Sequence, residues 1–477
     1  MKKRELVNLG LTHDAALREA IEVFKQARPD RTEAREAVRR LVRDPGSMTD
    51  DPVWGRVALA MVEAPPPALR DTPAPLSVWG RVGEDIDDAS VDQARRACEL
   101  PVSVAGALMP DAHVGYGLPI GGVLATAGAV IPYAVGVDIA CRMKVTVLDL
   151  PPALLETDAG RDRLTDAIES ETRFGMGASF GGRPGNGERR QHPVMDEDWK
   201  VSPVTARIKD KAHAQLGSSG SGNHFVEFGV LTVPEADGPN PLGLEPGTYL
   251  ALMSHSGSRA AGAAVCDFYS RVAMEHHPEL TGPHRHLAWL DLDSQPGREY
   301  WEAMNLMGRY ASANHACIHR HVTRRLGAEV IAGVENHHNF AWEERHVVDG
   351  EERTLIVHRK GATPAGRGVL GVIPGSMADP AFIVSGRDGP GSLSSASHGA
   401  GRVMSRTAAR NSFRWPAVRD LLRERGVTLI SAGLDENPGV YKDIRRVMAL
   451  QKNLVDPVAR FDPKLVKMAP EGEKAED

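Results

Sequence analysis

The chain has 477 residues, of which 42% are hydrophobic and 25% are charged, a composition typical of a soluble globular protein with about three domains or fewer larger ones. Its 57 lysines and arginines against 63 aspartates and glutamates give a formal net charge of −6, which excludes a globally basic nucleic-acid-binding surface but allows a local basic groove. The 4 cysteines lie far apart with no CxxC pair, which excludes a disulfide scaffold and a zinc ribbon and predicts a cytoplasmic location.

Two helices are predicted near the N-terminus. From residue 12 to residue 43, alanine, leucine, valine and isoleucine recur at helical spacing between arginines and glutamates, and Asp14 and Thr32 are candidate N-caps. Pro29 interrupts the pattern between the two helices. These helices predict a small helical extension over residues 1–63.

A proline-rich linker is predicted over residues 64–76. After it, glycine-rich, histidine-bearing segments alternate with apolar runs, and we expect residues 77–468 to form one large domain, followed by a charged, disordered tail over residues 469–477. The uncharged stretch 114–137 is long enough to span a membrane, but its prolines and glycines would break a membrane helix. Strands and turns are predicted there instead, with no membrane association.

The secondary-structure pattern predicts the fold class. β-branched runs at residues 144–148 and 354–357 alternate irregularly with helical segments, and the longest helical candidate, residues 297–326, precedes Gly327. No regular strand–helix–strand rhythm of the kind that predicts a parallel sheet is visible. We therefore expect an α+β protein with one large core of mixed α/β structure and the N-terminal helical extension.

Histidines in glycine- and serine-rich loops are the most informative residues. Asp138 and Cys141 lie three residues apart in GVDIAC, and His224, His255 and His338 each lie beside glycine, serine or asparagine. A carboxylate, a thiolate and three imidazoles suffice for one or two divalent metal ions, although each histidine taken alone is more often a structural residue. A Cys/His set favours zinc, whereas carboxylate and phosphate oxygens suit Mn²⁺ or Mg²⁺, so the spacing leaves the metal open.

Other segments suit phosphate chemistry. Arg259, Lys360 and Arg402 lie beside glycine or serine and Arg359 precedes Lys360, in segments where cations and free backbone amides can bind a polyphosphate, although an isolated loop cation is usually only solvated. His398 in SHGAGR has small neighbours. A histidine nitrogen can attack a phosphorus centre and carry a nucleotidyl group, and small residues leave room for in-line transfer. The alternative is a loop histidine beside a turn.

In this order, the segments resemble the RtcB family of GTP-dependent RNA-splicing ligases. The resemblance extends from Val78 to Met468 and includes MPDAHVGYGLPIGG, GVDIAC, GSGNHFVE, SHSGSR, ENHHNF, IPGSM and SHGAGR. It implies a mixed α/β core of the RtcB-like type and an enzyme that joins RNA ending in a 3′-phosphate or 2′,3′-cyclic phosphate to RNA with a 5′-hydroxyl. The implied cofactors are GTP and Mn²⁺, with two metal ions, and the implied intermediate is a covalent histidine–GMP.

The resemblance also implies roles for individual residues. His398 matches the histidine that becomes guanylylated. The implied metal ligands are Asp138, Cys141, His224, His255 and His338. The residues implied to contact or line the nucleotide are Asn223, Glu227, Asn339, Pro374, Gly375, Ser376, Met377, Gly399, Ala400, Gly401, Tyr441 and Lys467. An activating helper protein of the archease type is an implied partner.

Some positions depart from the family pattern. Arg142 follows Cys141 where the family usually has glycine, Ala381 stands in place of a serine at the nucleotide, and Ser397 replaces the usual cysteine before the nucleophile.

Two other functions stay open on the sequence alone. One is a metal-dependent RNA phosphoesterase or nuclease without ligation, which would not need His398. The other is a non-catalytic RNA-binding regulatory paralogue, which would form no nucleotide adduct.

Overall fold

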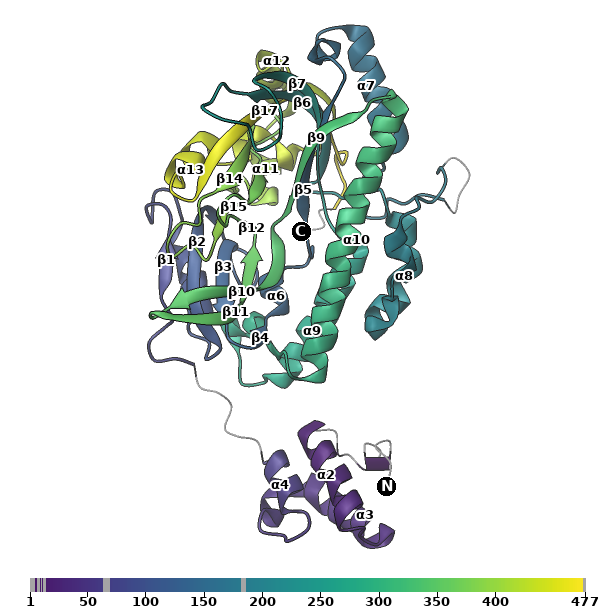
Figure 1. Ribbon diagram of the computed structural model, residues 1–477, viewed down its shortest axis with the longest axis vertical. Coiled ribbons are helices and arrows are strands. Elements are labelled where there is room, and N and C mark those ends of the chain that lie inside the picture. The colour runs from purple at the N-terminus through teal and green to yellow at the C-terminus, as the bar shows by residue number, and fades with distance from the viewer. Residues whose placement is uncertain are drawn as a thin grey trace. The chain divides into compact units, whose positions relative to one another are not determined.

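The computed structural model describes residues 5–6, 9, 11, 14–62, 69–181 and 186–474. The chain divides into two units, Met1–Leu69 and Arg70–Asp477 (Figure 1). Residues 64–68 of the predicted linker lie outside the described residues. Residues 70–76 pack within the larger unit, where the Arg70 and Ala74 amides donate to the Glu99 and Cys98 carbonyls at 2.7 and 2.8 Å.

The smaller unit consists of short helices around its own core. Its helices are α2 (Asp14–Gln26), α3 (Arg31–Arg43), the 3₁₀ helix η1 (Pro45–Met48) and α4 (Gly55–Met61). Ala34, Val38 and Leu41 recur at helical spacing on α3 and are fully buried. Both predicted helices are present, but Asp30 rather than Thr32 caps α3, because the Asp30 carboxylate accepts from the Thr32 amide at 2.8 Å.

The larger unit contains two main β-sheets (Figure 1). The five-stranded sheet has the order β1 (Leu76–Val78), β2 (Ser103–His113), β3 (Ile120–Thr126), β11 (Glu351–Lys360), β10 (Asn339–Val348). The eight-stranded sheet has the order β13 (Leu370–Ile373), β14 (Ala381–Gly386), β17 (Val455–Met468), β6 (Phe225–Val233), β7 (Gly247–Ser256), β5 (Arg142–Leu148), β9 (Val330–His337), with β16 (Thr428–Ser431) beside β17. Small sheets pair β4 (Ala129–Val130) with β8 (Leu290–Asp291) and β12 (Ala362–Pro364) with β15 (Ser395–Ser397). Antiparallel pairing predominates, and the predicted α+β class is confirmed.

Four neighbouring strands of the large sheet bring chemistry-bearing residues to one end. In the antiparallel order β6–β7–β5–β9, strands β6 and β5 begin where β7 and β9 end. His224 directly precedes β6, Cys141 directly precedes β5, His255 lies near the end of β7, and His338 directly follows β9. His338 is also the single residue between β9 and β10, which belong to different sheets. Residues far apart in the sequence therefore meet where the two sheets join.

Helices cover the sheets. They are α5 (Asp88–Cys98), α6 (Pro132–Val135), α7 (Asp158–Glu171), α8 (Pro203–Gln215), α9 (Arg259–His276), α10 (Gln295–Leu326), α11 (Arg406–Ser412), α12 (Trp415–Glu424), α13 (Ile444–Leu450) and the 3₁₀ helices η2 (Pro152–Leu155), η3 (Pro193–Asp196), η4 (Trp199–Val201), η5 (Gly282–Leu287), η6 (Leu434–Glu436) and η7 (Pro438–Val440). The longest, α10, packs on α7, α9, β5 and β7 (Figure 1). It ends at Gly327 with a φ of +62°, as predicted for a glycine C-cap. Among the described residues, no helix is long and apolar enough to cross a membrane.

The charged C-terminal segment differs from the predicted disorder. Ala469 is buried, and the Ser221 hydroxyl donates to the Lys474 carbonyl at 2.6 Å. The Trp415 indole donates to the Glu471 carboxylate at 2.8 Å. These contacts hold residues 469–474 against the larger unit despite their polar composition. Residues 475–477 lie outside the described residues.

Candidate active site

The five predicted metal ligands form a row of donor atoms at the end of the large sheet. Asp138 Oδ2 lies 3.1 Å from His224 Nε2, which lies 3.4 Å from Cys141 Sγ. Cys141 Sγ lies 3.1 Å from His255 Nε2, which lies 3.1 Å from His338 Nε2. The folded chain thus brings the whole predicted ligand set together.

The spacing of these atoms suits divalent metal ions. Bonds of about 2.0–2.3 Å keep neighbouring donors about 3 to 3.7 Å apart in tetrahedral or octahedral geometry, and the observed steps of 3.1–3.4 Å fall in that range. Cys141, His224 and His255 form a compact central group, with Asp138 and His338 beyond it at either end. This group of donors could hold a divalent metal ion, with Asp138 and His338 able to contribute from either side.

Neighbouring groups orient the ligands. His255 Nδ1 donates to the Asn223 carbonyl at 3.0 Å, so its Nε2 presents a lone pair to the row. Asp138 Oδ1 accepts from the Ser258 amide at 3.1 Å, which leaves Oδ2 for the row. Residue 257 must be glycine here, since a Cβ would lie 2.2 Å from either carboxylate oxygen of Asp138.

The surroundings of the ligands favour metal-binding protonation states. Burial and the charge of His224 lower the pKa of His255 to about 3, and burial and the charge of His398 lower the pKa of His338 well below its ordinary value. Burial alone would raise the pKa of Asp138, but the hydrogen bond and charge of His224 outweigh it and leave this pKa below its ordinary value. These two imidazoles are therefore neutral and the carboxylate ionised at neutral pH, as coordination requires.

His398 lies next to the metal-ligand row and is held by a buried carboxylate. Its ring centroid is 4.9 Å from that of His338. Its Nδ1 donates to Asp111 Oδ2 at 2.7 Å, and the same oxygen accepts from the His398 and Gly399 amides at 3.0 and 3.3 Å. Burial alone would raise the pKa of Asp111, but the bond to His398 outweighs it and keeps this pKa below its ordinary value. With Nδ1 protonated, Nε2 of a neutral ring carries a lone pair.

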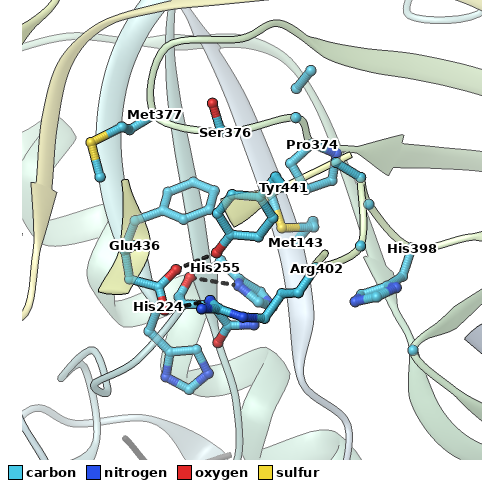
Figure 2. A pocket seen from close by; sticks show the side chains of 18 of the residues that line it. Met143, His224, His255, Pro374, Ser376, Met377, His398, Arg402, Glu436 and Tyr441 are labelled. Atoms are coloured by element: carbon cyan, nitrogen blue, oxygen red, sulfur yellow. Dashed lines mark hydrogen bonds and ion pairs between the residues drawn. The ribbon is translucent and has the colours of Figure 1, made fainter. Parts of the chain in front are cut away.

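One cavity joins the metal-ligand row, His398 and the predicted nucleotide-contacting loops (Figure 2). Of the predicted nucleotide contacts, its lining includes Asn223, Glu227, Asn339, Pro374, Gly375, Ser376, Met377, Gly399, Ala400, Gly401 and Tyr441. Apolar side chains, among them Met143, Phe225, Met253, Val466 and Met468, also line it. A cavity with metal-binding groups, a histidine and an apolar wall can hold a nucleotide by both its phosphates and its base.

Two acidic residues of the cavity differ in their environment. Burial raises the pKa of Glu227 well above its ordinary value. Glu436 instead accepts from the Tyr441 hydroxyl and pairs with Arg406, and Arg402 Nη1 lies 3.3 Å from it (Figure 2). Tyr441 is therefore held in place by a buried charged network.

Lys467, predicted to contact the nucleotide, does not itself line the cavity, although the residues on either side of it do. Side chains alternate along β17, and its neighbours Val466 and Met468 are the ones that line the cavity. The Lys467 ammonium instead lies 3.2 Å from the Glu169 carboxylate. The contact of Lys467 with the nucleotide stays a prediction.

Most of the cations predicted to bind phosphate are used inside the fold. Arg359 is fully buried and forms a two-bond ion pair with Glu344 at 2.8 and 2.9 Å. Arg259 and Lys360 are buried and donate to backbone carbonyls. Arg402 alone among the four lines the cavity. The other three do not line it and are held by contacts within the fold.

The residues that depart from the family pattern have clear positions. Arg142 points away from the metal-ligand row, pairs with Glu335 and donates to the Gly308 carbonyl at 2.8 Å, which ties the start of β5 to α10. Ala381 lines the cavity. The Ser397 side chain is buried on the strand before His398.

Sequence reasoning missed several functional positions. Asp111 lies in the segment MPDAHVGYGLPIGG. Its role could not be predicted there, because its contact is with His398, which is 287 residues away in the sequence. His113 and Asp379 also line the cavity. Glu436 is adjacent to Asp435 in a short helix. In the sequence alone, such an acidic pair indicates an exposed surface, because the arginines that pair with it lie in other segments.

Comparison with known proteins identifies the family of the chain. The family model described as "tRNA-splicing ligase RtcB" matches residues 93–468. The chain is 33% identical to the RNA-splicing ligase RtcB of Mycobacterium tuberculosis over 411 residues, which covers 74% of this chain and 94% of the relative. It is 32% identical to the tRNA-splicing ligase RtcB of Archaeoglobus fulgidus over 456 residues, covering 83% and 92%, and 32% identical to the RNA-splicing ligase RtcB of Escherichia coli over 416 residues, covering 80% and 94%. With the predicted ligand set assembled around His398 and nearly the full length of these relatives matched, the chain belongs to the RtcB family.

Proposed function

We propose that the protein is an RNA ligase that joins RNA 3′-phosphate or 2′,3′-cyclic phosphate ends to 5′-hydroxyl ends, with GTP and Mn²⁺, through a covalent His398–GMP. The relatives are named as RNA-splicing ligases, which supports the reaction class. The observation that carries the proposal is the position of His398, whose ring lies 4.9 Å from His338 at the end of a five-donor metal-ligand row.

The donor set fits two Mn²⁺ ions. Asp138, Cys141, His224, His255 and His338 would hold them, with donor spacings that suit metal–ligand bonds. Bound Mn²⁺ would neutralise phosphate charge and favour departure of pyrophosphate. The thiolate also suits zinc, whereas the carboxylate and the phosphate oxygens of GTP suit Mn²⁺.

The residues of the chain supply the nucleophile and its orientation. Asp111 holds the Nδ1 proton, so the Nε2 lone pair of His398 attacks the α-phosphorus of GTP. The N–P bond forms, the bond from the α-phosphorus to the β-phosphate oxygen breaks, and pyrophosphate leaves. An oxygen of the RNA 3′-phosphate then takes the GMP, which frees His398. A cyclic phosphate is hydrolysed to a 3′-phosphate beforehand.

The last step closes the RNA strand. The 5′-hydroxyl attacks the activated 3′-phosphate, forms the new phosphodiester and releases GMP and a proton. The apolar wall of the cavity, with Tyr441 held by Glu436, would position the base of the nucleotide. Glu227 lies in the same cavity and offers a carboxyl group to that base.

A ligation assay tests the proposal. RNA with a 3′-phosphate, or with a 2′,3′-cyclic phosphate, is incubated with 5′-hydroxyl RNA, GTP, Mn²⁺ and the full chain, and we expect a joined product that His398→Ala does not form. His276→Ala, at an exposed position near the end of α9, is the control and should ligate like the wild type. If the wild type joins no RNA but His398→Ala still hydrolyses the cyclic phosphate, the protein is a phosphoesterase. If the wild type binds RNA but neither joins nor hydrolyses it, the protein is non-catalytic.

Two further properties stay predictions. A helper protein of the archease type would raise the rate of the reaction, which addition of such a protein to the ligation assay would show. The cytoplasmic location rests on the four free cysteines, all of which are buried.

A further inference from the structure

An exposed aromatic residue lies in a turn whose two flanking residues line the active-site cavity. Tyr116 lies in the turn between β2 and β3 and is 71% exposed. His113 and Ile120, which bracket this turn, both line the cavity, whereas Tyr116 does not. The turn therefore leads from the cavity wall to the surface and presents a free aromatic ring there.

Tyr116 is one of three rings that form a group, which we call the aromatic platform. The rings of Tyr133 and His286 are stacked, with centroids 4.9 Å apart and planes at 24°. The Tyr116 ring centroid lies 6.1 Å from that of His286. Tyr133 and His286 are themselves only partly buried. A grouped aromatic surface of this kind has faces left over for another flat group.

Buried polar side chains fix the turn that carries Tyr116. Gln93 donates to the Gly115 and Gly117 carbonyls at 2.6 and 2.7 Å and accepts from the Gly115 amide at 3.1 Å. The buried Lys360 ammonium donates to the Tyr116 carbonyl. The backbone is therefore held while the ring remains exposed. A pre-organised ring loses little conformational entropy when a ligand stacks on it.

Charged side chains of both signs lie near the platform, and the exposed cation next to His286 in the chain is Arg285. Partial burial lowers the pKa of His286, and the charges of exposed Arg285 and buried Lys360 both contribute to lowering it. Near Tyr133, exposed Asp267 and Arg271 oppose each other in charge. Aromatic faces beside positive charge are the combination that binds single-stranded nucleic acid, since bases stack on the rings and cations attract the phosphates.

We infer that the aromatic platform binds the unpaired nucleotides next to the RNA end that enters the cavity. This inference rests on the proposed function, because chemistry at His398 is what brings an RNA end to this opening. Every base has a π-face, so stacking on Tyr116 is tolerant of sequence. The platform would therefore align RNA ends of differing sequence with the cavity and read no particular base.

RNA binding by the full chain tests the platform. Two fluorescent single-stranded RNAs, one with a free 3′-phosphate and one with a free 5′-hydroxyl, are titrated with wild type, Tyr116→Ala and Tyr116→Phe. Loss of a stacked base should weaken binding of at least one RNA by about 5- to 100-fold in Tyr116→Ala, whereas Tyr116→Phe keeps the ring and the affinity. The RNA that is affected identifies the strand on the platform. Tyr249→Ala, at the opposite end of β7 from His255, is the matched control.

The GTP step separates failure of this inference from failure of the proposed function. Transfer of GMP to His398 needs no RNA and is measured on the same wild-type preparation. If the wild type forms the adduct but Tyr116→Ala binds both RNAs as tightly as the wild type, the platform is overturned and the proposed function stands. Equal losses in Tyr116→Ala and Tyr116→Phe would also overturn it, since stacking needs only the ring. A wild type that forms no adduct overturns the proposed function itself.

Discussion

At the scale of single residues, Asp111 decides which nitrogen of His398 can react. One of its buried oxygens accepts from the His398 ring and from two backbone amides, so it fixes both the tautomer and the orientation of the ring. An amide at this position can donate as well as accept, and it carries no charge to stabilise the proton on Nδ1. The reactivity of His398 is therefore expected to depend on this carboxylate.

Asp111→Asn should slow adduct formation by about 10²- to 10⁴-fold, the range seen when a buried carboxylate that orients a catalytic histidine is neutralised. The affinity for GTP should change much less, because Asp111 does not itself line the cavity. The rate of transfer of α-labelled GTP to protein measures the effect. Asp210→Asn, at the surface, is the control. A wild-type rate in Asp111→Asn would contradict the role.

Glu227 makes the stability of the metal- and nucleotide-free protein depend on pH. Its folded-state pKa is raised well above the ordinary 4.5 by burial, so the folded protein holds this proton more tightly than the unfolded chain does. Stability is then lost as the pH rises from the ordinary glutamate range toward the folded-state pKa. Each tenfold difference in proton affinity is worth about 1.4 kcal/mol.

The substitution Glu227→Gln should remove this loss of stability at high pH. With chelator present, its melting temperature should exceed that of the wild type at pH 8 and converge with it near pH 4, as followed by thermal unfolding across this range. The exposed Glu235→Gln is the matched control, with no pH-dependent difference expected. A wild type that is the more stable protein at pH 8 would show that Glu227 is stabilised as a carboxylate.

Residue types and their glycine-rich contexts made the five ligand candidates and His398 conspicuous, and the order of the segments, through the resemblance to the RtcB family, selected them; the structure brings them together at one end of the large sheet. Their partners were not predictable in the same way. Asp111 and Glu436 act through contacts with residues far from them in the sequence, and a sequence match does not show which face of β17 the Lys467 side chain occupies.

At the scale of elements, the site depends on strand ends that meet at one end of the large sheet. Antiparallel pairing places the starts of β5 and β6 beside the ends of β7 and β9. The helix α10 and its glycine cap were predictable from local pattern, as was the N-terminal helix pair. Strand order was not, because the partners of β5 and β17 are separated from them by long stretches of chain.

Gly257→Ala tests the packing that shapes this end of the sheet. The added Cβ would lie 2.2 Å from the Asp138 carboxylate oxygens and would push that ligand out of the row. We expect at least tenfold weaker Mn²⁺ binding by calorimetry, roughly the loss caused by disturbing the surroundings of a metal ligand, with an unchanged circular dichroism spectrum. At Gly366 a Cβ would make only an ordinary 3.5 Å contact, so Gly366→Ala should bind Mn²⁺ normally. Undiminished binding by Gly257→Ala would contradict the ligand role of Asp138.

At the scale of the whole molecule, the chemistry belongs to the larger unit. All five metal ligands, His398 and the cavity lining lie within Arg70–Asp477, which has its own cores. The smaller unit, with a separate core, contributes none of these residues. Composition predicted a helical N-terminal extension, but nothing in its sequence pattern indicates a catalytic group.

Removal of residues 1–69 should therefore leave the GTP step intact. We expect the chain 70–477 to form the adduct at a rate within about twofold of the full chain, since every residue of the site lies in this unit and the unit has its own cores. Side-by-side labelling of the two proteins measures this. A loss of adduct formation in a shortened chain that still melts cooperatively would assign the N-terminal unit a part in the chemistry.

The most direct test of the central claim is labelling of the protein with GTP that carries ³²P at the α-phosphate, in the presence of Mn²⁺. The geometry at Asp111, His398 and His338 predicts a phosphoramidate adduct that is stable to alkali, labile to acid and located on the peptide that contains His398. His398→Ala should carry no label. Label on another residue, or equal labelling of His398→Ala, would contradict the account.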